Sequence, residues 1–151
     1  MKNTPPAARP ARKKANMFSP AKGGRRADLD NRYFRSRWEA NWARYLNWQV
    51  ANGVIVAWEY EVDTYCFEKI TRGNRFYTPD FKIFENDGRI VYHEVKGWMD
   101  ASSKTKLKRM QLYYPNIIIR LIDKPVYTAM ARQMRPILKD AGWEYDDKQL
   151  R

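Results

Sequence analysis

Three charged residues in the middle of the chain have side chains that could hold a metal ion at one place on a sheet. Glu94 and Lys96 are two positions apart in a segment with strand character, so their side chains point to the same face. Asp80 lies in the preceding strand-like segment, and the turn sequence Asn-Asp-Gly at residues 86–88 makes the two segments neighbours. Counting back from that turn brings Asp80 close to the level of Glu94 and Lys96. We therefore expect two carboxylates and one ammonium group to converge.

This combination of groups is suited to phosphodiester hydrolysis. Two adjacent carboxylates repel each other unless a cation lies between them, and Mg²⁺ or Mn²⁺ takes oxygen ligands and keeps room for a phosphate. Lys96 could hold or deprotonate an attacking water, or neutralise charge in the transition state. The chain has one histidine, His93, and one cysteine, Cys66, which argues against a zinc cluster, an intrachain disulfide or a Ser-His triad.

The same residues carry a family resemblance. Pro79-Asp80 followed by Glu94-Val95-Lys96 resembles the signature of the PD-(D/E)xK nuclease superfamily. The runs Phe-Arg-Ser-x-x-Glu at residues 34–39, Tyr-Thr-Pro-Asp-Phe at residues 77–81 and Glu-x-Lys-Gly at residues 94–97 look like those of phage Holliday-junction resolvases of the endonuclease I type. The resemblance covers roughly residues 34–122.

The resemblance implies a fold, a metal site and a partner. It implies a restriction-endonuclease-like mixed β-sheet flanked by helices, in a homodimer that cuts four-way DNA junctions. It implies two Mg²⁺ or Mn²⁺ ions per site, at the usual two-metal separation of roughly 3.5–4 Å. The carboxylates of Glu39, Asp80 and Glu94 and the backbone carbonyl of Val95 would hold these ions, and Lys96 would assist the water.

Other candidate residues have two interpretations that the sequence leaves open. Glu39 is also the acid of a capping box, Ser36-x-x-Glu39, in which it bonds a backbone N–H at the helix start. Arg35 and Arg37 flank Glu39 and are candidates for binding DNA phosphates beside the metal. Basic residues in the helix after the motif either clamp phosphates or form an ordinary solvated face: Lys104, Lys106, Lys108 and Arg109.

Three features are expected to be structural. His93 should point away from Glu94, because neighbouring strand residues face opposite sides of a sheet. Cys66 is expected to be a buried apolar residue. The stripe Trp38, Trp42 and Tyr45 has helical spacing and is expected to face a core rather than to stack on bases.

Hydrophobic periodicity predicts a mixed α/β fold with the order α-β-β-β-β-α-β-α. Helices are expected at residues 36–52, 102–114 and 126–141, the last interrupted or kinked near Pro136. Strands are expected at residues 54–60, 62–69, 76–84 and 89–96. The apolar, β-branched residues 117–122 predict a buried central strand.

The charge is concentrated at the N-terminus. The net charge is +12, and residues 1–26 carry eight Lys or Arg and no acid, together with several Pro and Gly. We therefore predict a disordered basic arm at residues 1–26, suited to phosphate binding, and a single nuclease domain at residues 27–151. The sequence shows no apolar stretch of the roughly 20 residues that span a membrane and no signal peptide, so a cytoplasmic location is expected.

Together these observations predict a Mg²⁺-dependent, structure-selective endodeoxyribonuclease that acts on Holliday junctions. A restriction-like, repair or transposon-end nuclease of the same superfamily would have the same site and a different target. A basic nucleic-acid-binding protein without catalysis would explain the charge equally well. It gives no reason for Asp80, Glu94 and Lys96 to converge.

Overall fold

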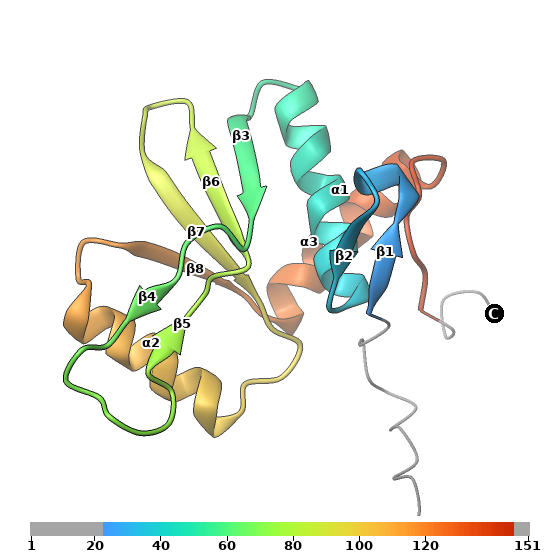
Figure 1. The fold of residues 1–151 in the computed structure, drawn as a ribbon. Helices are drawn as coiled ribbons and strands as arrows, with labels where there is room; N and C mark the ends of the chain where they lie inside the picture. The colour runs from blue at the N-terminus through green and yellow to red at the C-terminus, as the bar shows by residue number, and fades with distance from the viewer. Residues whose placement is uncertain (1–22, 147–151) are drawn as a thin grey trace, which may run out of the picture.

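The computed structural model describes residues 23–146 and has a mixed α/β fold (Figure 1). This agrees with the fold class expected from periodicity. Its elements in chain order are β1 (Gly24–Arg26), the 3-10 helix η1 (Ala27–Leu29), β2 (Arg32–Phe34), α1 (Arg37–Ala51), β3 (Ile55–Tyr60), β4 (Tyr65–Cys66), β5 (Phe76–Tyr77), β6 (Phe81–Glu85), β7 (Ile90–Val95), α2 (Ala101–Tyr113), β8 (Ile118–Ile122) and α3 (Lys124–Leu138).

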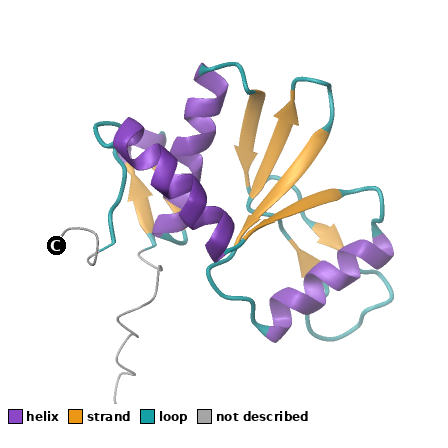
Figure 2. Ribbon diagram, turned by 180° about the vertical axis from the view of Figure 1, so that it is seen from behind, coloured by secondary structure: helices purple, strands orange, loops and turns teal. Residues whose placement is uncertain are grey.

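The main sheet has four strands in the order β3-β6-β7-β8. The first three strands are antiparallel to their neighbours, whereas β8 runs parallel to β7 and is reached through α2. α1 and α3 lie on one side of the sheet with the β1–β2 hairpin, and α2 lies on the other with the small β4–β5 sheet (Figures 1 and 2). Residues of the sheet strands therefore alternate between two different cores.

The larger core forms between α1, α3 and the sheet. It includes Phe34, Leu46, Phe81 and Ile83, each at most 1% exposed. The Trp38–Trp42–Tyr45 stripe packs against this core, as predicted: Trp42 is 4% exposed, and Trp38 and Tyr45 are partly buried. The smaller core joins α2 to the β4–β5 sheet through Phe67, Tyr77 and Met110.

Two predicted strands are shorter than expected. The segment 76–84 is split into β5 and β6 because Pro79 has no N–H to donate to a strand ladder. The segment 62–69 keeps only β4, since Glu61 has a φ of 50° and turns the chain away after β3. Cys66, predicted to be buried, is half-buried because β4 belongs to a two-stranded sheet rather than to the main one.

The prediction that residues 117–122 form a buried central strand was wrong about the position of this strand in the sheet. β8 is an edge strand, and Ile118 is 41% exposed. Ile119 packs against the smaller core, while Ile122 belongs to the larger one. The apolar pattern thus reflects a strand that contacts both cores and not a strand with two neighbours. The last helix, α3, contains Pro136 in its final turn and ends at Leu138 instead of residue 141.

The boundary of the basic arm at residue 26 was placed too late. Gly24–Arg26 form β1, and the Arg26 guanidinium donates to both carboxylate oxygens of Glu144 at 2.9 Å. This ion pair connects residues far apart in sequence, which is why local composition did not predict it. The rest of the expected arm, residues 1–22, lies outside the described residues. Within the described part of the chain, no helix is long and apolar enough to cross a membrane.

Candidate active site

The strand register brings the two predicted acids together. β6 and β7 pair so that Phe81 faces His93, which places Asp80, just before β6, opposite Glu94. Phe81 and His93 face the larger core, so Asp80 and Glu94 emerge on the opposite side. Asp80 is 2% exposed and Glu94 is 6% exposed. The predicted convergence of the two carboxylates is therefore present, in a buried setting.

Each acid is held by specific donors. The backbone N–H of Val95 donates to Asp80 Oδ2 at 2.7 Å, and the Arg35 guanidinium donates to Asp80 Oδ1 at 2.8 Å. The Tyr77 hydroxyl donates to Glu94 Oε2 at 2.9 Å, while Lys96 Nζ lies 3.6 Å from Glu94 Oε1. The carboxylates are thus fixed in orientation, and the lysine adjoins them as predicted.

Burial makes ionisation of this pair unfavourable. Loss of solvation raises the pKa of Asp80 well above its usual value, and the nearby charges of Glu94 and Glu39 raise it further. Burial also raises the pKa of Glu94, although Lys96, Tyr77 and Arg35 oppose the shift. Acids that are costly to ionise in isolation are stabilised as carboxylates by a nearby cation. The site therefore favours binding of positive charge.

Glu39 takes part in the start of α1 and lies near the acidic pair, while its role as a metal ligand stays a prediction. Ser36 is the N-cap of α1, and its Oγ accepts from the Glu39 N–H at 3.1 Å. The Glu39 carboxylate accepts from the N–H of Arg35 at 3.1 Å, one residue before the N-cap N–H that the capping box predicted. The Tyr60 hydroxyl also donates to Glu39 Oε2 at 2.5 Å. The negative charge of Glu39 raises the pKa of both Asp80 and Arg35, so this side chain lies near the acidic pair while it contributes to the start of α1.

Arg35 lies among the acids. Its guanidinium pairs with Asp80 and with Glu61, and the carboxylates of Asp80, Glu61 and Glu39 together outweigh burial and raise its pKa. The side chain is nevertheless 55% exposed, so it can also face solvent and a ligand. Arg37 lies elsewhere: it donates to the carbonyl of Tyr145 at 2.8 Å and pairs with Asp146 at 2.7 Å. The structure thus brings Arg35, but not Arg37, to the site.

A cavity of about 50 Å³ opens beside Glu94, and Asp80 is not among the residues that line it. Its volume suits a small ion or a few waters. Positive and hydroxyl groups dominate its lining, which comprises Arg35, Tyr77, Thr78, Glu94, Lys96, Ser103 and Lys106. A phosphate group would meet complementary charge and hydrogen-bond donors at this place.

Among the four basic residues predicted on α2, only Lys106 lines the cavity. Lys104 and Lys108 are exposed on α2, outside that lining. Arg109 instead donates to the carbonyl of Asn74 at 2.8 Å and holds the loop before β5. Sequence reasoning missed Tyr77, Thr78 and Ser103 as cavity residues, although Tyr77 and Thr78 belong to the same Tyr-Thr-Pro-Asp-Phe run as Asp80.

The donor set fits a hydrated divalent ion held by two acids. In residues 23–146, no three His, Cys, Asp or Glu side chains are grouped so that they could hold a metal ion by themselves. Asp80 and Glu94 provide a carboxylate pair, and Mg²⁺ is commonly bound by one or two carboxylates together with waters and substrate phosphate. Arg35 currently supplies positive charge to Asp80, so an ion at the pair would compete with this guanidinium.

His93 is a structural residue of the larger core, as predicted. It is 7% exposed, and its Nδ1 accepts from Trp42 Nε1 at 3.2 Å. Its Nε2 is buried without a hydrogen-bond partner in the described structure. Burial and the charge of Arg120 lower its pKa from 6.5 to about 4.

The lowered pKa of His93 predicts acid sensitivity. Unfolding restores the ordinary pKa, so the unfolded chain binds the proton first and stability falls as pH drops from 6.5 towards about 4. The free energy of unfolding should lose about 3 kcal/mol through this group. Urea unfolding of the wild type and His93→Gln at about pH 7.5 and about pH 4 measures this loss. Equal pH dependence in the two proteins would contradict the assignment.

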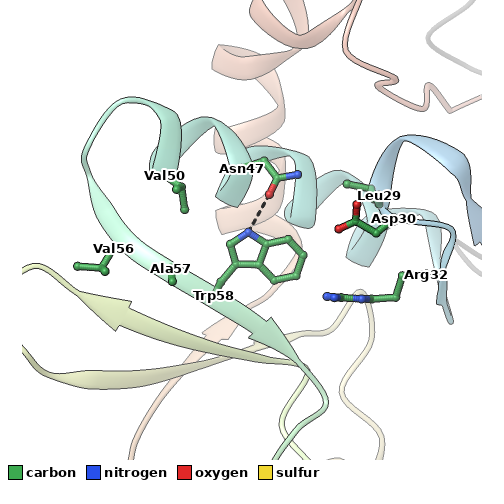
Figure 3. A pocket seen from close by; sticks show the side chains of 8 residues that line it. All are labelled: Leu29, Asp30, Arg32, Asn47, Val50, Val56, Ala57 and Trp58. Atoms are coloured by element: carbon green, nitrogen blue, oxygen red, sulfur yellow. Dashed lines mark hydrogen bonds between the residues drawn. The ribbon is translucent and has the colours of Figure 1, made fainter.

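Another hollow lies away from the acidic pair, at the β3 edge of the sheet (Figure 3). It has a volume of about 250 Å³ and contains none of the predicted site residues. The aromatic residue of this hollow, Trp58, already has partners within the chain. Its Nε1 donates to Asn47 Oδ1 at 2.9 Å, and the Arg32 guanidinium lies 5.4 Å from its ring centre. This hollow therefore lies apart from the candidate site at β6, β7 and α2.

Comparison with known proteins identifies the family and no activity. No match was found among curated proteins, and none among solved structures. A family model described as a protein of unknown function, DUF1064, matches residues 22–129, a span that includes Glu39, Asp80, Glu94 and Lys96. The chain therefore belongs to the DUF1064 family.

Proposed function

We propose that this protein is a metal-dependent DNA endonuclease with its active site at Asp80, Glu94 and Lys96. The observation that carries the proposal is the pair of buried carboxylates facing each other across β6 and β7, with Lys96 Nζ 3.6 Å from Glu94. A structural ion pair would not require two acids with raised pKa values in one place. Perturbed acids in a polar cavity are typical of catalytic sites.

The metal ligands in this proposal are Asp80 and Glu94, with Glu39 close by. A bound Mg²⁺ or Mn²⁺ would supply Lewis acidity and an activated water, the usual contributions of a metal to phosphodiester hydrolysis. A second ion, the carbonyl of Val95 and a direct ligand role for Glu39 rest on the resemblance to resolvases. The N–H of Val95 donates to Asp80 Oδ2 and fixes the orientation of this carboxylate next to Glu94.

The remaining cavity residues have complementary roles. Lys96 is close enough to the acids to orient a water or to neutralise the charge that develops on the phosphate. Arg35, from the β2–α1 connection, and Lys106, from α2, line the same cavity and provide phosphate contacts. Hydrolysis adds water across one P–O bond, leaving a phosphomonoester on one fragment and a hydroxyl on the other.

The topology and charge support a restriction-endonuclease-like fold and DNA as the partner. The mixed sheet has three antiparallel strands and a parallel fourth strand, and helices flank it. This arrangement is expected for a restriction-endonuclease-like fold. A net charge of +12 favours a polyanionic partner such as DNA. Four-way junctions as the target and a homodimeric assembly follow from the resemblance and belong to the same proposal.

Cleavage of matched substrates tests the proposed target. A four-way junction and a linear duplex of the same sequence are mixed in equal amounts with Mg²⁺, competitor DNA and the protein. We expect the junction to be cut faster, since its shape is what a resolvase recognises. Equal cleavage of both DNAs would favour another nuclease of the superfamily. Binding of both without any cleavage would favour a non-catalytic nucleic-acid-binding protein.

A further inference from the structure

Trp98 is the most exposed large apolar side chain in residues 23–146. It is 82% exposed, compared with 77% for Leu112 and 58% for Val56. It lies in the loop between β7 and α2, directly after the Glu-x-Lys-Gly run. A single exposed apolar residue is ordinary, but the position of this one beside the candidate active site is informative.

The loop that carries Trp98 is anchored at both ends on the cavity. On one side, Lys96 lines the cavity and its N–H donates to the carbonyl of Ile122 at 3.0 Å. On the other, Asp100 caps α2 by accepting from the N–H of Ser103 at 2.7 Å, and Ser103 also lines the cavity. Trp98 is two residues from Lys96, so their Cα atoms are at most about 7 Å apart. The loop therefore forms part of the rim of the site, although the Trp98 ring itself does not line the cavity.

The charges around this rim suit a nucleic acid. Besides Lys96, the cavity is lined by Arg35 and Lys106, which would hold a phosphate group. The pKa of Asp100 is lowered by its hydrogen bonds to Ser103 and by the charges of Lys96 and Lys106, so the loop lies within the field of both lysines. Aromatic rings beside such positive grooves are the usual platforms for unpaired bases.

We propose that Trp98 is a base-stacking site that binds an unpaired nucleobase next to the phosphate held in the cavity. This inference rests on the proposed function and adds a basis for structure selectivity. In a continuous duplex the base faces are covered by their neighbours, so the ring finds a partner only where stacking is interrupted, at an open branch point, a bulge or an end. A lipid surface or an apolar protein partner would not need the cationic cavity beside the ring.

Binding assays with paired and unpaired DNA test the site. Fluorescence anisotropy in EDTA compares a labelled duplex with the same duplex carrying an unpaired bulge. Trp98→Ala should weaken binding of the bulged DNA by about 10- to 100-fold and change binding of the plain duplex less than about twofold. Trp98→Phe should restore most of the affinity, because its ring can also stack. Leu112→Ala, which removes another highly exposed apolar group from α2, should leave both affinities unchanged.

Binding and cleavage assays together distinguish failure of the stacking site from failure of the proposed nuclease activity. Equal affinity of wild type and Trp98→Ala for the bulged DNA, equal losses on both DNAs, or no binding of either DNA by the wild type would overturn the stacking site. Cleavage assays on the same DNAs with Mg²⁺ then address the proposed function separately. A wild type that prefers bulged DNA through Trp98 but cuts nothing would overturn the nuclease and retain the stacking site.

Discussion

Asp80→Asn is expected to reduce DNA cleavage by about 10³-fold or more while leaving the fold and DNA binding in place. A metal ion supplies several kcal/mol of transition-state stabilisation, and each 1.36 kcal/mol changes the rate tenfold. Asparagine has nearly the same shape but lacks the negative charge that would hold the ion. Single-turnover cleavage with Mg²⁺ measures the rate, and a gel shift in EDTA measures the affinity.

Asp80→Asn should also change how stability depends on pH, an effect that can be measured without any DNA cleavage. Burial, Glu94 and Glu39 raise the pKa of Asp80, so the folded state favours the protonated acid. Wild-type stability is therefore lost through this group as pH rises from 3.8 through the raised value. Asparagine cannot ionise, and Asp80→Asn should not lose stability over that range.

Thermal unfolding in EDTA at about pH 5 and about pH 8 compares the two proteins. The contribution of His93 is common to both, so the difference between their pH dependences reports on Asp80 together with its effect on Glu94. A variant that cuts DNA at the wild-type rate would refute the active-site assignment. A variant with the same pH dependence as the wild type would refute the electrostatic description of the acidic pair.

Lys96→Met should reduce the cleavage rate by about 10²- to 10⁴-fold, with less than about a tenfold loss of DNA affinity. Methionine keeps much of the side-chain length but removes the ammonium group 3.6 Å from Glu94. A group that acts on the water or on the developing phosphate charge affects the rate more than binding. Lys108→Met is a matched control, because Lys108 is exposed on α2 and does not line the cavity.

Rate and affinity are separated by measuring single-turnover cleavage at saturating protein and binding in Ca²⁺. Weak binding with a wild-type rate would make Lys96 a phosphate anchor instead of a catalytic residue. Unchanged rate and affinity would make it an ordinary solvated residue of the strand end.

Local patterns predicted the parts of the fold that depend on near neighbours. The helical spacing of Trp38 and Trp42 predicted α1 and its buried face, because both positions contact the same core. The Asn-Asp-Gly turn at residues 86–88 predicted the β6–β7 pairing, and this register placed Asp80 opposite Glu94. Pairing across a short turn is set by the turn itself, so the central acids could be found from the sequence.

Features that depend on distant contacts could not be predicted in this way. Arg37 resembled a phosphate ligand by its position beside Glu39, but its partners are Tyr145 and Asp146, more than a hundred residues away. Arg109 is likewise held by the backbone carbonyls of Gly73 and Asn74, which precede it by more than thirty residues. Charge alone did not distinguish such internal contacts from Lys106, which lines the cavity.

Plasmid cleavage by proteins purified in parallel tests whether Asp80 and Glu94 form a metal-dependent active site. Supercoiled plasmid is incubated with the wild type or Asp80→Asn, each with Mg²⁺ and each with EDTA, after both have been shown to be folded. We expect nicked and linear DNA only for the wild type with Mg²⁺. Equal nicking by the two proteins, or nicking by the wild type in EDTA, would contradict a metal-dependent active site at Asp80 and Glu94.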